Sequence, residues 1–194
     1  MRKLFLFLGL GVMFVFPSFA SAQNNVTIAN MTVQLWPEFD QPSMLVIADF
    51  QVAADSTLPV EMTFRIPQEA NLIAVATQTD DGSFLNALFE GPTAEAEWQS
   101  FTVTISENTT YRFEYYQPLT FSGNQRTFSY LWDGAYAVDQ FHVLVLEPKD
   151  VTSFSMSPVY ASISQQNGSN YYDSGFVKLA KGGQFALNLQ YEKT

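Results

Sequence analysis

The chain has 194 residues with no cysteine and a single histidine, and its formal net charge is −10. The cysteine count excludes disulfide bridges and thiol catalysis, and the two counts together exclude zinc sites built from Cys and His or from three His. The negative charge repels phosphates and anionic lipid headgroups, which excludes nucleic acid as a partner. The fold must therefore be held by a packed apolar core.

The first 22 residues have the pattern of a cleavable signal peptide. Two basic residues at positions 2–3 precede an apolar run over 4–16, Pro17 ends that run, and small side chains lead up to Ala22. The run is shorter than the roughly 20 apolar residues of a transmembrane helix. We therefore expect a secreted or extracytoplasmic protein, with no membrane insertion after cleavage of residues 1–22.

Cleavage leaves residues 23–194, which is an ordinary length for one domain with its own core. Because the two basic residues at positions 2–3 are removed, 7 Lys and Arg face 19 Asp and Glu, a net charge of −12.

Apolar and polar side chains alternate through most of this domain, which is the pattern of half-buried strands. Such strands are predicted, in chain order, at 60–66, 101–105, 111–115, 128–132 and 185–191. Residues 44–48 and 143–146 are apolar throughout, which predicts central strands covered on both faces. Further strands are predicted at 26–35, 72–77 and 175–179.

The connections contain turn-forming residues, and Asp81-Gly82 and Asp133-Gly134 are candidates for tight hairpin turns. Residues 84–89 and 93–98 allow at most a short helical turn each. Residues 147–172 are polar and aperiodic, which predicts a mobile loop.

Together these features predict an all-β fold, an antiparallel β-sandwich of the immunoglobulin-like or jelly-roll-like kind, with roughly nine to ten strands. A closed barrel is the alternative, and the two central strands favour two packed sheets.

The sequence contains few residue patterns that could form an active site. A Ser-His-Asp site would depend on His142, which falls in the middle of a predicted strand, and no G-x-S-x-G elbow is present. Carboxylate pairs of the kind used by glycosidases could come from Glu38 and Asp40, from Glu95 and Glu97, or from Glu114. Acid pairs are unavoidable in a chain this acidic, so we predict no catalytic residue and no enzyme.

No cofactor and no metal site are predicted. Calcium is the one ion for which the sequence offers candidate ligands. Asp80-Asp81-Gly82 and Asp133-Gly134 offer carboxylate oxygens in turns. Neither shows the alternating Asp-x-Asp-x-Asp spacing of a calcium loop, so turn formation is the better interpretation.

Aromatic side chains are the enriched chemistry. Tyr115-Tyr116 and Tyr171-Tyr172 place adjacent rings on opposite faces of an extended chain. Exposed rings stack on sugars or anchor protein interfaces, whereas most aromatic residues belong to a core. Tyr116 and two residues near predicted strand ends, Trp132 and Tyr136, are the predicted ligand-binding residues.

Four short stretches resemble a pattern in uncharacterised exported bacterial β-sandwich domains of the Chloroflexi type. They are Leu35–Pro42, the strand at 44–48, Arg65-Ile66-Pro67 and Glu114-Tyr115-Tyr116. The resemblance extends over most of residues 23–194 and implies an extracytoplasmic domain without an assigned activity.

We expect a non-enzymatic binding module for a carbohydrate or an envelope protein. The alternatives are a structural or adhesive component of the cell envelope and a glycan-active enzyme.

Overall fold

The computed structural model describes residues 26–193, so the predicted signal peptide at residues 1–22 lies outside the described part of the chain. The described residues form 16 strands and no helix, which confirms the predicted all-β class. Accordingly, no helix in residues 26–193 is long and apolar enough to cross a membrane.

The strands are β1 (Thr27–Pro37), β2 (Ser43–Val52), β3 (Val60–Pro67), β4 (Asn71–Gln78), β5 (Phe84–Asn86), β6 (Phe89–Glu95), β7 (Trp98–Ile105), β8 (Tyr111–Pro118), β9 (Thr120–Ser122), β10 (Gln125–Trp132), β11 (Ala137–Leu146), β12 (Val151–Ser157), β13 (Ser162–Gln166), β14 (Ser169–Asp173), β15 (Val177–Leu179) and β16 (Phe185–Lys193).

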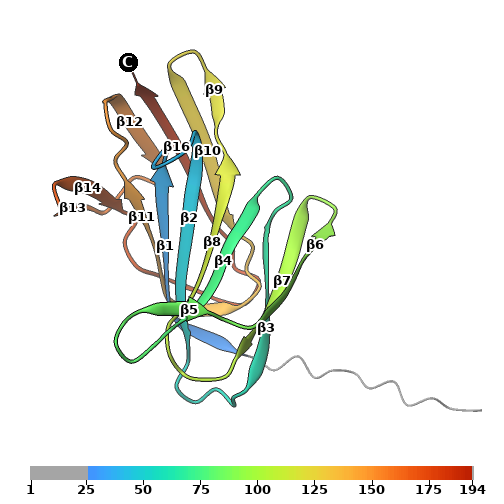
Figure 1. The fold of residues 1–194 in the computed structure, drawn as a ribbon. Helices are drawn as coiled ribbons and strands as arrows, with labels where there is room; N and C mark the ends of the chain where they lie inside the picture. Colours follow the sequence, from blue (N-terminus) through green and yellow to red (C-terminus); the bar gives the residue numbers. More distant parts are fainter. Residues whose placement is uncertain (1–25, 194) are drawn as a thin grey trace, which may run out of the picture.

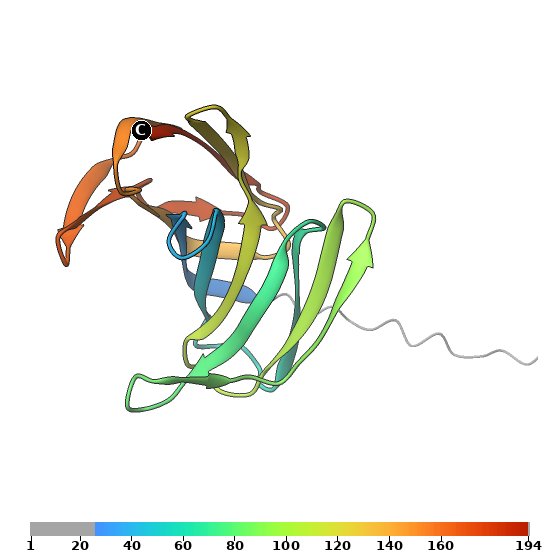
Figure 2. The same ribbon diagram turned by 45° about the horizontal axis from the view of Figure 1, so that its top comes forward.

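Three sheets make up the fold (Figure 1). A nine-stranded sheet runs β13-β14-β11-β1-β2-β8-β4-β5, with β15 also paired to β11. A four-stranded sheet runs β12-β16-β10-β9, and a three-stranded sheet runs β3-β7-β6. Figure 2 shows the hairpins β13–β14 and β4–β5 standing out at opposite ends of the nine-stranded sheet.

Both smaller sheets pack on the same face of the nine-stranded sheet. Phe50 of β2 contacts Phe64 of β3 at a ring-centroid distance of 4.8 Å, and Phe141 of β11 contacts Phe185 of β16 at 5.0 Å. Both Phe50 and Phe141 belong to the inner face, because Met31 of β1 pairs with each of them in register. The predicted sandwich is therefore a large sheet facing two small ones across one apolar core.

All ten predicted strands are present, and their placement follows from side-chain alternation. The two segments that are apolar at every position became central strands, as predicted. β2 lies between β1 and β8, and β11 lies between β14 and β1. One pair departs from the antiparallel rule, since β1 and β11 run parallel.

Six strands were not predicted, and full exposure explains two of the longer ones. All seven residues of β6 and all five of β13 are exposed, so neither has an apolar face that could produce alternation. The segments at 84–89 and 93–98, for which short helical turns were allowed, form β5, β6 and the turn before β7. The predicted loop at 147–172 contains β12, β13 and most of β14, so that prediction was wrong.

Of the two candidate hairpin turns, one closes a hairpin and the other connects two sheets. Asp81-Gly82 does close the β4–β5 hairpin, with Gly82 at φ 85°. Asp133-Gly134 instead carries the chain from β10 in the four-stranded sheet to β11 in the nine-stranded sheet. A Cβ atom on Gly134 would lie 2.7 Å from the backbone carbon of Gly182, so this connection requires glycine.

Candidate functional site

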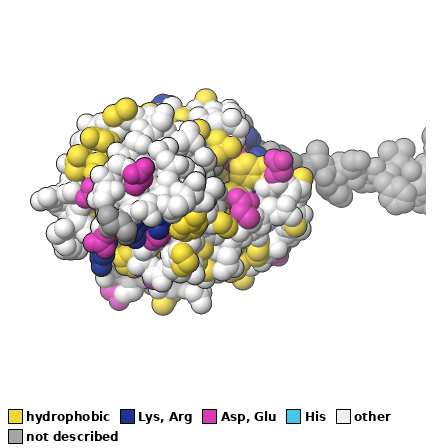
Figure 3. Space-filling model, turned by 90° about the horizontal axis from the view of Figure 1, so that it is seen from above, with side chains coloured by type: hydrophobic (Ala, Val, Ile, Leu, Met, Phe, Trp, Pro, Cys, Tyr) yellow, Lys and Arg dark blue, Asp and Glu magenta, His cyan; other side chains and the backbone are white. Residues whose placement is uncertain are grey.

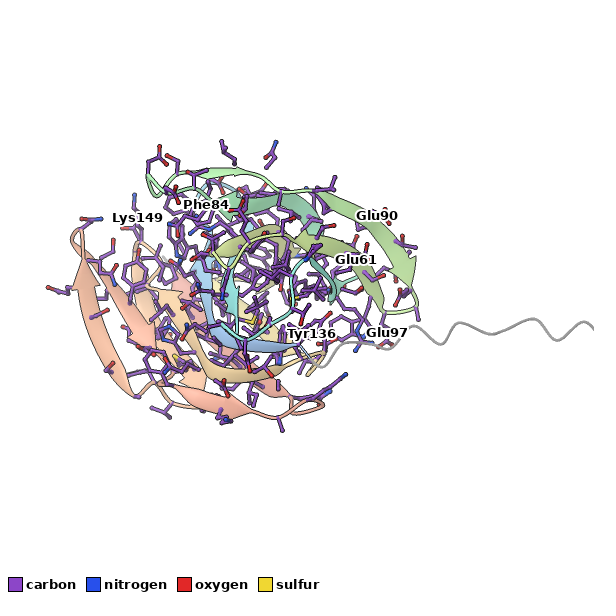
Figure 4. The ribbon with its side chains drawn as sticks, turned by 90° about the horizontal axis from the view of Figure 1, so that it is seen from below. Glu61, Phe84, Glu90, Glu97, Tyr136 and Lys149 are labelled. Atoms are coloured by element: carbon purple, nitrogen blue, oxygen red, sulfur yellow. The ribbon has the colours of Figure 1, made fainter. Side chains whose placement is uncertain are left out.

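The structure separates the three predicted ligand-binding residues. Trp132 and Tyr136 are buried, with 5% and 7% of their surface exposed, and both belong to the core. Tyr136 lies among the packed side chains between the sheets (Figure 4), where its hydroxyl oxygen accepts a hydrogen bond from the Thr63 N–H at 2.7 Å. The prediction assumed exposed rings, and only Tyr116 is partly exposed.

Tyr116 points to the outer face of the nine-stranded sheet, opposite to the two small sheets. It pairs in register with Leu45 of β2, which in turn pairs with Trp36 of β1, so the three side chains form a row across neighbouring strands. Leu45 and Ile47 are only 7% and 5% exposed, yet they are not part of the core cluster. The outer face therefore has an apolar centre of its own.

The β1–β2 hairpin adds the most exposed aromatic ring to this row. Phe39 packs against Trp36 with ring centroids 4.7 Å apart and ring planes tilted by 53°, and it is 57% exposed. The next residue, Asp40, accepts a 2.6 Å hydrogen bond from the Tyr116 hydroxyl. We call Trp36, Phe39, Asp40, Leu45 and Tyr116 the aromatic patch.

The hairpin has a fixed shape that holds these side chains in place. Glu38 adopts φ 47°, and its N–H donates to the Ser43 carbonyl at 2.9 Å. Pro37 and Pro42 flank the turn and restrict the backbone on both sides. Phe39 was not predicted as a site residue, although an aromatic residue in a turn between two prolines was a sequence signal for it.

A depression of about 250 Å³ lies beside the aromatic patch. Its lining residues are Gln41, Pro42, Ser43, Glu69, Asn71, Tyr116, Gln117 and Pro118. None of them is basic, and Glu69 contributes a carboxylate. The loop that carries Glu69 is held by Gln99, whose amide donates to the carbonyls of Pro67, Gln68 and Ala70.

The electrostatics of the patch are acidic. The hydrogen bond to Asp40, with a smaller contribution from desolvation, raises the pKa of Tyr116 to about 12. The phenol is therefore neutral at physiological pH and acts as the donor to Asp40. Two buried polar atoms at this end of the sheet have no partner, Trp36 Nε1 and Ser43 Oγ. Apolar rings beside carboxylates and amides can bind a protein side chain or a sugar.

Apart from Asp40, which accepts from Tyr116 within the aromatic patch, the candidate carboxylates of a glycosidase are engaged elsewhere. Glu38 accepts a hydrogen bond from Tyr191 at 2.8 Å and lies 3.6 Å from Arg126 and 3.4 Å from Lys193. Figure 3, viewed from above, shows acidic and basic side chains meeting beside hydrophobic ones.

The remaining acids do not converge on one cleft. Glu95 accepts from Ser100, Glu97 lies in the turn between β6 and β7, and Glu114 faces Arg112 at 3.7 Å. Figure 4 shows Glu97 on the three-stranded sheet, far toward the outside of the molecule.

His142 forms an arrangement that resembles a catalytic triad. Its Nε2 lies 2.9 Å from Thr32 Oγ1, and its Nδ1 lies 3.4 Å from Asp173 Oδ1. Phe176 stacks on the ring at 4.1 Å. Thr32 sits in the middle of β1, which pairs with a strand on each side, so its own backbone N–H is used in the sheet. The three side chains link the neighbouring strands β1, β11 and β14.

The two acidic turns weighed for calcium are used for turn formation and ion pairing. Asp81 Oδ1 accepts from the Thr79 hydroxyl at 2.6 Å and from the Ser83 N–H at 3.0 Å, and these bonds lower the pKa of Asp81. Asp133 pairs with Arg65 at 2.6 Å. Within residues 26–193, no group of three or more acidic and histidine side chains is placed to hold a metal ion.

A second depression, of about 390 Å³, lies where β4 and β5 meet the β7–β8 connection. Hydroxyl groups dominate its wall, together with Asp80, Glu107 and the exposed Leu88. It contains no exposed aromatic ring, because Tyr111 is buried and its hydroxyl accepts from the Ser106 N–H.

No protein-family model matches the chain, and no curated protein matches it in sequence. Solved structures do match in fold. An M1 zinc metallopeptidase from Deinococcus radiodurans gives a TM-score of 0.52 at 14% identity, covering 88% of this chain and 43% of that one. Aminopeptidase A from Legionella pneumophila gives 0.51 at 10% identity over 87% and 21%, and yeast LTA4 hydrolase gives 0.51 at 8% over 86% and 29%. This chain thus spans less than half the length of these proteins, and the likeness concerns the fold alone.

Proposed function

We propose that this protein is a non-enzymatic, extracytoplasmic binding module that recognises another protein through the aromatic patch. The single observation that carries the proposal is Phe39, which is 57% exposed and packs against Trp36 beside the Tyr116–Asp40 pair. An exposed ring supported from behind by a second ring is already ordered, so little conformational entropy is lost when a partner covers it.

Two further features support a protein partner. Trp36 and Tyr116 are partly exposed beside Phe39, which gives the patch the apolar centre that interfaces require. Asp40 and Glu69 lie at its rim, and the net charge of residues 23–194 is −12, so the expected partner presents basic residues around an apolar anchor.

The fold comparison supports a non-catalytic role. The matched structures are peptidases whose chains extend well beyond the matched part. The zinc-binding H-E-x-x-H motif of such enzymes requires two histidines, and this sequence contains one. We therefore propose that this domain acts through contact with another protein and not through zinc chemistry.

A carbohydrate ligand is the second candidate. It is favoured by the depression beside Tyr116, where Gln41, Asn71 and Glu69 offer amide and carboxylate groups next to a ring. Such groups hydrogen-bond sugar hydroxyls while the ring contacts the sugar face.

The test compares Phe39→Ala with Phe121→Ala. Phe121 on β9 is 46% exposed, belongs to a different sheet, and serves as the matched control. Immobilised wild type and both variants are incubated with extracytoplasmic proteins of the producing organism and, separately, with a glycan array. We expect one protein to be retained by wild type and Phe121→Ala, with about 30-fold weaker binding to Phe39→Ala.

Photo-crosslinking from position 39 checks that the contact is direct. Equal retention by both variants contradicts the proposal. If wild type and Phe121→Ala retain a glycan and Phe39→Ala does not, the ligand of the aromatic patch is a carbohydrate and not a protein.

A further inference from the structure

The β13 edge of the nine-stranded sheet lies in a charge-free part of a strongly acidic protein. From Val151 to Tyr172 the sequence contains no Asp, Glu, Lys, Arg or His, a run of 22 residues. This run includes β12, β13 and most of β14. It also exposes three large apolar side chains, Val159 at 75%, Ile163 at 49% and Tyr160 at 37%.

β13 is an edge strand without the usual protection. It pairs with β14 in an uninterrupted register, and no strand of the described chain pairs with its other side. All five of its residues are exposed, and the sequence Ser-Ile-Ser-Gln-Gln has no charge and no proline. Exposed edges of this kind pair readily with further strands, and proteins normally block them.

Most other edges of the described sheets are blocked. β5, β9 and β15 have three residues each. β6 is interrupted by a bulge and contains Glu90, Pro92 and Glu95, and β3 carries Glu61 and Arg65. β12 is also uncharged, but a bulge shifts its start and two of its side chains, Phe154 and Met156, are partly or fully buried. Among the described strands, β13 is the longer edge that is uncharged, regular and exposed at every residue.

We propose that β13 pairs antiparallel with β13 of a second copy of this chain, forming a two-fold symmetric dimer with one continuous sheet. A second copy is proposed as the partner of this edge because of how charge is distributed on the protein. Two molecules whose residues 23–194 each carry a net charge of −12 repel one another, and the charge-free corner lets them touch without bringing acidic groups face to face. Figures 1 and 2 both show the β13–β14 hairpin projecting at the rim of the molecule, where a second copy can approach.

The hairpin geometry fixes the register of this dimer. Asn167 and Gly168, at φ 51° and 79°, form a two-residue turn, so Gln166, Ser164 and Ser162 direct their backbone groups toward β14. The backbone groups of Ile163 and Gln165 therefore point outward. A two-fold axis at Ser164 pairs Ile163 of each copy with Gln165 of the other and uses all four outward pairs of N–H and C=O groups. It also brings the two Ile163 side chains diagonally together on one face.

The natural absence of cysteine allows a direct test of this register. The two Ser164 residues would face each other as a non-hydrogen-bonded pair, with Cα atoms about 4.5 Å apart, which suits a disulfide bond. We expect Ser164→Cys to form a covalent dimer in high yield on mild oxidation. Ser162→Cys is the matched control, because its two copies would lie four residues out of register, about 13 Å apart.

Equilibrium sedimentation of the purified protein gives an independent reading. We expect a dimer that tightens with added salt, since screening weakens the repulsion between the two acidic bodies. Ser164→Lys places like charges opposite one another and should weaken the dimer at least about tenfold. Ser155→Lys adds the same charge on an exposed position of β12 and should leave it unchanged.

A wild type that stays monomeric at all concentrations overturns the proposal. So does equal crosslinking of the Ser162→Cys and Ser164→Cys variants, which would show collision without register. The aromatic patch is on other strands, so failure here leaves the binding proposal standing, and the reverse also holds.

Discussion

The hydroxyl group of Tyr116 donates a 2.6 Å hydrogen bond to Asp40 Oδ2, joining residues 76 positions apart in the sequence. This bond connects the outer face of β8 to the β1–β2 hairpin. It also makes Tyr116 a spectroscopic reporter of the aromatic patch, because the hydrogen bond is the main cause of its raised pKa.

We expect Asp40→Asn to lower the pKa of Tyr116 from about 12 toward the ordinary value near 10. The measurement is an ultraviolet titration of tyrosine ionisation, with Tyr116→Phe identifying the signal. Because the folded-state pKa lies above the unfolded one, this contribution to stability is intact below pH 10 and is lost as pH rises from 10 to 12. Tyr172, whose pKa is raised to about 12 by burial and by its bond to Glu147, should titrate unchanged in Asp40→Asn.

Phe64 joins the nine-stranded and three-stranded sheets. It is 1% exposed, and its ring lies within 5.8 Å of the rings of Phe50, Phe101, Phe113 and Tyr136. Phe64→Ala should therefore cost about 3–5 kcal/mol of unfolding free energy in urea denaturation. Phe39→Ala should cost less than about 1 kcal/mol, because that ring is mostly exposed. Similar costs for both variants would mean that the aromatic patch is a structural element.

Gly134 should be the least replaceable of the turn glycines. Gly134→Ala combines φ 82° with a Cβ 2.7 Å from Gly182, so we expect a loss of about 3 kcal/mol or more in thermal denaturation. Gly82→Ala is the control, since φ is 85° there and nothing lies within 4 Å of the added Cβ. Its cost should be limited to the backbone term of about 1–2 kcal/mol. Equal losses would indicate that the Gly134–Gly182 approach relaxes freely.

The Thr32–His142–Asp173 network should be structural. Thr32→Val removes the hydroxyl that faces His142 Nε2 at 2.9 Å, and we expect a loss of about 1 kcal/mol in stability. Wild type and variant should hydrolyse p-nitrophenyl esters at the same background rate. Labelling of Thr32 by a fluorophosphonate in the wild type would contradict this and would identify a nucleophile.

Local chemistry explains which parts of the fold could be predicted from the sequence. The strands with one buried face, such as β3 and β16, show strict alternation, and β2, which is buried on both faces over residues 44–48, shows an apolar run. The alternation records a burial difference between neighbouring residues, and the run records burial of every residue. β6 and β13 are exposed on both faces, so no such difference exists and no local pattern could indicate them.

The candidate site likewise has features that could be predicted from the sequence and features that depend on the fold. Composition alone determined that the protein lacks cysteine, has one histidine, and is acidic and rich in aromatic residues, because these are counts that folding does not change. The tertiary structure decided which rings are accessible. Trp132 and Tyr136 went into the core, and Phe39 and Tyr116 met on the outer face. Adjacent strands in the sheet are distant in the sequence, so the row from Trp36 through Leu45 to Tyr116 exists only after β1, β2 and β8 pair.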